Sequence, residues 1–216
     1  MLAAWRILPD STAIAESTAP DAVIQAAMQG LKPFLDKIPQ EARAQFGFDP
    51  ADSFNAAVLG APVLVHTITP AALEQYQAGT AVTSLLTPTT LWYFPVRIAG
   101  QAKAILVVDR LQDQWQAVSL GYFGLAREWD AIVKQWPESQ GFHPELIAIF
   151  QAQQHAFTVP KKGVDNLTLL TSGPMETGKA QAAGAQPPYA TLGDATTVIQ
   201  NLIPAVENNL LEPTPE

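Results

Sequence analysis

The most specific motif match in this sequence is a glycine-rich run: residues 173–179 read Gly-Pro-Met-Glu-Thr-Gly-Lys. This fits the first seven positions of a phosphate-binding loop, in which backbone N–H groups cradle phosphate and the lysine reaches its oxygens. Such a loop also needs a hydroxyl at the next position to hold Mg²⁺, and that position is Ala180. We therefore interpret the match at Gly173, Gly178 and Lys179 as coincidental. The sequence predicts no nucleotide site and no cofactor.

The three histidines are the next candidates for chemistry. His66 alternates with Leu64 and Ile68, which predicts a side chain directed at a packed sheet face, with a general base or ligand contact as the alternative. The spacing of His143 and His155 matches no metal motif. Cysteine is absent, which excludes disulfides, thiolate metal sites and thiol nucleophiles. We predict no metal site.

No catalytic set assembles from the other reactive residues. The sequence contains no Gly-x-Ser-x-Gly elbow for a serine nucleophile. Asp109 and Asp113 flank a predicted turn, and Glu128 and Asp130 lie in a predicted helix. Neither pair has the apolar surroundings that would separate two carboxyl pKa values for acid–base work. The sequence therefore favours a protein that is not an enzyme.

A run of aromatic residues offers a different kind of site. Residues 92–94 are Trp, Tyr and Phe in a predicted strand, so their side chains divide between the two sheet faces. One face is assigned to the core. The other carries Leu91, Tyr93 and Arg97, and it lies either under a helix or open to solvent. In the open case, these residues and His66 are the predicted surface for a ligand or partner.

Composition limits the class of partner. The net charge is −8, and the 12 basic residues are scattered, so we predict no nucleic-acid binding. No apolar run approaches the ~20 residues that a membrane-spanning helix needs. The stretch 8–20 is rich in Ser, Thr, Ala and Pro and is predicted to be a flexible leader, which favours a periplasmic or secreted protein; a cytoplasmic location is the alternative.

The hydrophobic pattern predicts elements that must position these residues. Apolar residues at helical spacing predict a helix over 21–35, with short helices over 40–46 and 50–58. A strand over 62–68 and a short helix from Thr69 follow. Alternation over 90–98, 102–109 and 115–120 predicts three antiparallel strands. Pro95 cannot donate to a ladder, so the first is expected to be an edge strand or to turn its free side outward.

Further elements follow in the second half of the chain. A helix over 123–136 is expected to cover the Trp92 face through Leu125, Trp129 and Ile132. The pattern then predicts a helix over 144–151 and strands over 153–159 and 164–171. The composition of 172–189 is that of a linker, and 194–211 regains helical spacing, interrupted by Pro204.

The fold class predicted from these elements is α+β: an antiparallel β-meander of about four to six strands with helices packed on it. The predicted organisation is a flexible leader (1–20), a single domain (21–171), a flexible linker (172–192), and a C-terminal helix and tail (193–216).

The landmarks between residues 50 and 160 carry a resemblance. They are Leu-Gly-Ala-Pro at 59–62, Trp-Tyr-Phe-Pro at 92–95, the hairpin glycine at 100, Trp115, and Leu-Gly at 120–121. This pattern resembles a loosely defined α+β domain of uncharacterised exported or lipid-anchored bacterial proteins. The resemblance implies an architecture and export, and it assigns no functional residue.

Three functions follow as hypotheses. The first is a non-enzymatic binding or protein-interaction module of the bacterial cell envelope, with another protein or a small ligand as partner. The second is a small enzyme or ligand carrier with a pocket near His66. The third is a structural or assembly protein.

Overall fold

The computed structural model describes residues 19–160, 165–172, 189 and 191–211. The strands are β1 (Val58–Leu59), β2 (Val63–Ile68), β3 (Leu86–Ile98), β4 (Gln101–Leu111), β5 (Gln114–Gly121), β6 (Glu145–Ile149), β7 (Gln154–Thr158) and β8 (Thr168–Leu169). The α-helices are α1 (Asp21–Asp36), α2 (Pro70–Glu74), α3 (Phe123–Gln135) and α4 (Ala195–Leu211). Short 3₁₀ helices are η1 (Gln40–Phe46), η2 (Phe54–Ala56), η3 (Val82–Leu85), η4 (Glu138–Gln140) and η5 (Phe150–Ala152).

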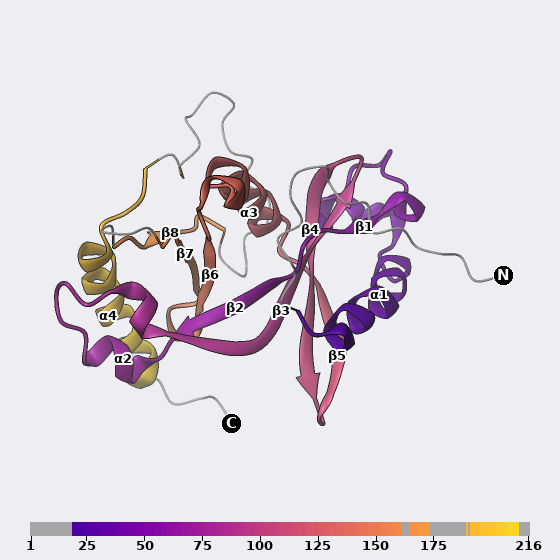
Figure 1. Cartoon of the computed structure of the whole chain (residues 1–216). Helices are drawn as coiled ribbons and strands as arrows, with labels where there is room; N and C mark the ends of the chain where they lie inside the picture. Colours follow the sequence, from indigo (N-terminus) through magenta and orange to yellow (C-terminus); the bar gives the residue numbers. More distant parts are fainter. Residues whose placement is uncertain (1–18, 161–164, 173–188, 190, 212–216) are drawn as a thin grey trace. The chain divides into compact units, whose positions relative to one another are not determined.

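The strands hydrogen-bond as one eight-stranded, mostly antiparallel sheet in the order β5-β4-β3-β2-β6-β7-β8, with β1 also paired to β3 (Figure 1). The α+β class is confirmed, and the sheet is larger than the four to six strands predicted. The chain divides into two compact units. Unit 1 comprises the chain up to Leu64 together with Thr90–Asp130, and unit 2 comprises Val65–Thr89 together with the chain from Ala131.

The predicted meander forms unit 1. In the β3–β4 hairpin, Trp92 lies opposite Val108 and Ile98 lies opposite Gln101. The two turn residues, Ala99 and Gly100, both have positive φ (50° and 78°), as the tight turns that suit the twist of a hairpin require. β5 pairs with β4 through a second short turn and completes the antiparallel meander.

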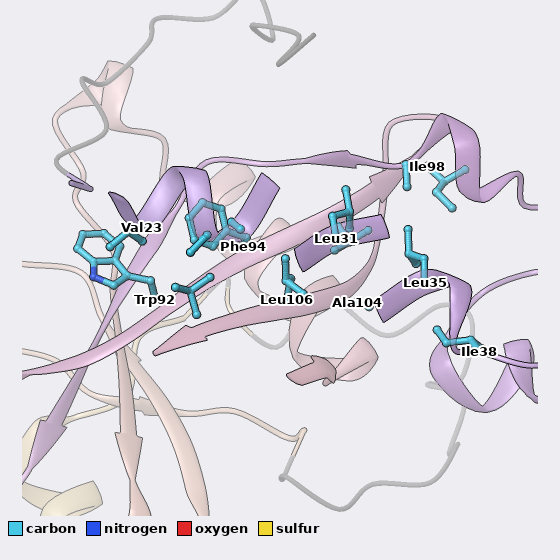
Figure 2. Close-up of a cluster of buried hydrophobic side chains, with 14 of the residues drawn as sticks. Val23, Leu31, Leu35, Ile38, Trp92, Phe94, Ile98, Ala104 and Leu106 are labelled. Atoms are coloured by element: carbon cyan, nitrogen blue, oxygen red, sulfur yellow. The ribbon is translucent and has the colours of Figure 1, made fainter. Parts of the chain in front are cut away.

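The core of unit 1 lies between this sheet and α1. Val23, Leu31 and Leu35 of α1 share a buried cluster with Trp92 and Phe94 of β3 (Figure 2). The face assigned to the core from alternation is therefore correct, but the helix predicted to cover it is not. Helix α1 covers it, and none of Leu125, Trp129 and Ile132 belongs to this cluster. Alternation identifies the face of a strand, and it cannot identify which of several amphipathic helices packs there.

Strand β3 is not the edge strand that Pro95 predicted, because it pairs with β4 on one side and with β1 and β2 on the other. Gly60 N–H donates to the Pro95 carbonyl at 2.7 Å, next to the β1–β3 pair Leu59–Val96. Antiparallel partners that face each other in this way exchange two bonds, and proline can supply only the acceptor. The side of Pro95 that lacks an N–H thus faces the end of the two-residue strand β1, and Pro95 is buried, so this side does not turn outward as the second form of the prediction expected.

Unit 2 contains a parallel pair, β2 beside β6, in which Val65 lies opposite Leu146. The predicted helix over 144–151 is wrong: β6 occupies most of this segment and forms a hairpin with β7. Four consecutive residues of β6, from Leu146 to Ile149, are buried. A strand buried on both faces is a continuous apolar run, which has no periodicity to distinguish it from a helix.

Helix α4 packs into the core of unit 2 through Ile199, Leu202 and Val206, together with Ile147 of β6. The predicted C-terminal helix is therefore present, and Pro204 lies inside it. The glycine-rich match at 173–179 lies outside the described residues, as do most of the predicted leader and linker.

Candidate functional site

The predicted surface around Tyr93 is largely covered. Tyr93 is only 4% exposed, and the ring of Tyr122, which immediately precedes α3, stacks on it with centroids 6.0 Å apart. Burial, followed by the neighbouring Tyr122, raises the pKa of the Tyr93 hydroxyl far above its ordinary value. Of the two arrangements that the sequence left open for this residue, cover is the one observed.

Arg97 is ion-paired with Asp130 of α3 and also donates to the Gly100 carbonyl at 3.2 Å. Both side chains of the ion pair are mostly buried. Leu91 is half-buried. Tyr93 and Arg97 therefore share a β3 face that contacts Tyr122, just before α3, and Asp130 within it.

His66 belongs to unit 2, in β2, where it lies opposite Ile147. The side chain is half-buried, and its Nδ1 atom is shielded from solvent without a hydrogen-bond partner among the described residues. Neither of the two hollows described below is lined by His66.

A different site lies in unit 1, in the segment between α1 and β1. Gly47 ends η1 with a φ of +80°. A Cβ at Gly47 would lie 2.7 Å from the Lys103 carbonyl oxygen and would also overlap the Phe123 side chain, so only glycine fits there. This close approach fixes the segment 47–52 against β4.

The Lys103 ammonium also binds the segment 47–52. The Lys103 side chain is 4% exposed, and its Nζ bonds to Asp49 and, at 3.1 Å, to Asp52. Burial alone would lower the pKa of Lys103, but the hydrogen bonds to Asp49 and Asp52 and their negative charges raise it above its ordinary value. Its hydrogen bond and its charge lower the pKa of Asp49. The buried cation is therefore satisfied, as burial of a charge requires.

Two adjoining hollows lie between the C-terminal end of α1 and the segment 52–55. The larger, of about 360 Å³, has a wall of Arg43, Asp52, Ser53 and Asn55. The smaller, of about 110 Å³, is lined by apolar Met28, Leu31 and Phe54 and by Lys32. Leu35, Asp36, Phe54 and Asn55 line both. We call the two hollows together the α1 groove.

Arg43 lines the larger hollow of the α1 groove and makes few hydrogen bonds. Its guanidinium lies over the ring of Phe54, 4.1 Å from the centroid, and Phe54 in turn packs edge-on against buried Phe48. The Nε atom of Arg43 is buried and has no hydrogen-bond partner among the described residues. The guanidinium makes one long hydrogen bond, from Nη1 to the Asp52 carbonyl at 3.4 Å. The site thus presents a stacked guanidinium with unused donors.

Sequence reasoning did not find this site. A usable signal was nevertheless present, because Phe46, Phe48 and Phe54 lie in a segment rich in turn residues. Aromatic residues in such a segment must pack against something, and here Phe48 packs on Phe54, whose ring lies under the Arg43 guanidinium.

No family model matches this chain, and neither curated proteins nor solved structures gave a match. Within the described ranges, His, Asp and Glu side chains form no group of three or more that could hold a metal ion. None of the helices in the described ranges combines the length and apolar character needed to cross a membrane.

Proposed function

We propose that this protein is a non-enzymatic binding module and that the α1 groove is its binding site. The observation that carries the proposal is the Arg43 guanidinium, which lines the larger hollow, is stacked on Phe54 and makes one long hydrogen bond, to the Asp52 carbonyl. A ligand that brings a carboxylate or carbonyl oxygen to this guanidinium gains a charge-assisted hydrogen bond. The larger hollow is mostly polar and falls in the usual size range of ligand sites, and the smaller one adds an apolar wall.

The cell envelope is the proposed location of this module, and its partner is a protein or a small ligand. This part of the proposal rests on the composition of the predicted leader and on the resemblance to exported domains. Fractionation of cells that express the native gene tests it separately: recovery in the periplasmic or secreted fraction supports the location, and recovery in the cytoplasm contradicts it.

Occupation of the groove can be tested without knowing the ligand. A mixed library of acidic, basic and neutral small molecules is screened against the labelled protein by two-dimensional amide NMR. We expect shift changes from bound compounds to concentrate at residues 28–36, 43 and 52–55. Asn55 is exposed and lines both hollows, so Asn55→Trp should fill them with a large ring and abolish the shift changes caused by bound compounds. Gln45→Trp, an equally exposed substitution in η1 away from the groove, should leave them intact.

Binding elsewhere, or binding unaffected by Asn55→Trp, would refute the groove as the site. Absence of any ligand-dependent change would favour the structural or assembly role.

An enzyme or ligand carrier at His66 is the second candidate, favoured by the unpaired Nδ1 atom in β2. This nitrogen is shielded from solvent in the observed conformation, so a ligand would bond to it only after the His66 ring turns. The same screen separates the two candidates. The groove predicts that His66→Gln leaves binding unchanged, whereas a His66 site predicts that this variant loses binding and Asn55→Trp retains it.

A further inference from the structure

The charges around the α1 groove balance. Asp36 is paired with Lys32, whose Nζ lies 2.6 Å and 2.8 Å from the two carboxylate oxygens. Lys103 is shared by Asp52 and Asp49. Within the described part of the chain Arg43 completes this balance without an ion pair of its own. Arg43 is therefore the cation of the groove that can bind a ligand, and the nearby carboxylates repel a multiply charged anion more strongly than a singly charged one.

The shape of the available cation favours a planar anion. A guanidinium presents its donors as a rigid fork that matches the two oxygens of a carboxylate. Stacking on Phe54 holds the plane of the Arg43 fork, so less freedom is lost when a ligand binds. A monoanionic carboxylate thus fits both the charge and the geometry at this end of the groove.

The other end of the groove is small and apolar. Met28 is 43% exposed although it is a large hydrophobic residue, and it lines the hollow of about 110 Å³ with Leu31 and Phe54. A hollow of this size suits one apolar side chain better than a long acyl chain. The groove between the two ends carries Ser53 and Asn55, which can hydrogen-bond to peptide groups.

We infer that the α1 groove binds the C-terminal residue of a peptide, with its carboxylate on Arg43 and an apolar side chain beside Met28 and Phe54. This inference rests on the proposed function, since it names the ligand of the same site. It adds that recognition requires a free carboxylate and an apolar last residue.

The test compares matched probes on the intact chain by amide NMR titration. N-acetyl-leucine carries the carboxylate and the apolar group, and N-acetyl-leucinamide lacks only the charge. We expect the acid to bind about tenfold more tightly or better, because it alone supplies charged acceptors to the Arg43 guanidinium. An acetylated tripeptide that ends in leucine should bind more tightly than N-acetyl-leucine, and decanoate and inorganic phosphate should bind more weakly.

Variants assign the preference to Arg43. Arg43→Gln should remove the difference between acid and amide, and Arg43→Lys, which keeps the charge without the fork, should leave a reduced one. Arg127→Gln is the matched control, because Arg127 is an exposed arginine over the ring of Phe123 outside the groove. Retained folding of each variant is checked by its melting temperature, and Arg43→Lys serves if Arg43→Gln does not fold.

The outcomes separate the two levels of the argument. Equal binding of acid and amide at the groove would overturn the carboxylate inference and leave the proposed function standing. Tighter binding of decanoate than of the tripeptide would overturn the peptide and identify the ligand as an amphiphilic acid. Tighter binding of phosphate would overturn it and identify the ligand as a simple anion. No shift at residues 28–36 and 52–55 with any probe would overturn both proposals.

Discussion

Gly30 of α1 lies directly against Ala117 of β5: a Cβ at Gly30 would fall well under 3.0 Å from the Ala117 Cβ. The atom it would meet belongs to a short side chain fixed to a strand backbone, so it cannot swing aside. Glycine at position 30 therefore allows α1 to lie against β5 at this point.

Gly30→Ala should therefore destabilise the protein, although alanine is the better helix former by about 1 kcal/mol. Overpacking typically costs about 1–3 kcal/mol, so after the gain in helix propensity we expect a net loss of up to about 2 kcal/mol in the free energy of unfolding measured with urea. Ala117→Gly removes the clashing Cβ, so the double variant should recover much of the loss. A Gly30→Ala variant more stable than the parent would show that α1 does not pack this closely.

Lys103→Met should cost much more than loss of its exposed partner. Removing the buried ammonium leaves Asp52, whose side chain is 11% exposed, without its cation, and breaking such pairs typically costs about 3–5 kcal/mol. Asp49→Asn removes a carboxylate that is 69% exposed, and exposed pairs contribute little to stability because solvent screens them. The loss of unfolding free energy in each variant is measured by urea unfolding at neutral pH. Equal losses would mean that Asp52 is not stabilised by Lys103.

The N-terminus of α4 depends on Asp194. Its carboxylate accepts from the Thr197 backbone N–H at 2.8 Å and from the Thr197 hydroxyl at 2.7 Å, which lowers the pKa of Asp194. Asp194→Ala should lower the melting temperature because it removes the N-cap, whereas Asp194→Asn, which keeps an acceptor at this position, should lower it much less. Thermal unfolding compares the two variants. An equal loss for Asn and Ala would show that the charge, and not the cap, carries the effect.

Alkaline pH should destabilise the fold through Tyr93. Its folded pKa is raised, so its contribution to stability is complete below the unfolded pKa of about 10 and is lost as pH rises above it. Tyr93→Phe should show a shallower decline of unfolding free energy above about pH 10. Tyr76→Phe, which leaves Tyr93 in place, should keep the steep decline. The same steepness in Tyr93→Phe would contradict the buried position of this hydroxyl.

Local signals predicted most elements of unit 1, because its hairpin alternates cleanly and α1 has a regular apolar stripe. The sequence failed where a choice depended on distant parts of the chain. Strand β6 lacks periodicity since both of its faces are buried, and its parallel partner β2 precedes it by some 80 residues. Likewise, nothing local to Trp92 shows that α1 rather than α3 lies over it.

The candidate site was missed for a related reason. Arg43 occupies a short 3₁₀ helix with no motif around it, and its significance comes from an unmet hydrogen bond and the ring of Phe54, eleven residues away. The sequence singled out Tyr93 and Arg97 because aromatic and charged residues on an alternating strand suggest an open face. The cover provided by Tyr122 and Asp130 depends on how α3 leaves the sheet, which alternation does not report.

The order in which the elements of unit 1 are synthesised affects the nascent chain. Helix α1 is completed early in synthesis, yet the strands against which it packs end only at Gly121, after an excursion of the chain into unit 2. At a synthesis rate of roughly 5–20 residues per second, Val23, Leu31 and Leu35 wait about 4–17 s before β5 emerges from the ribosome. During this time their apolar stripe is exposed and can be bound by chaperones. The nascent chain should therefore depend on chaperones more than other chains of similar length.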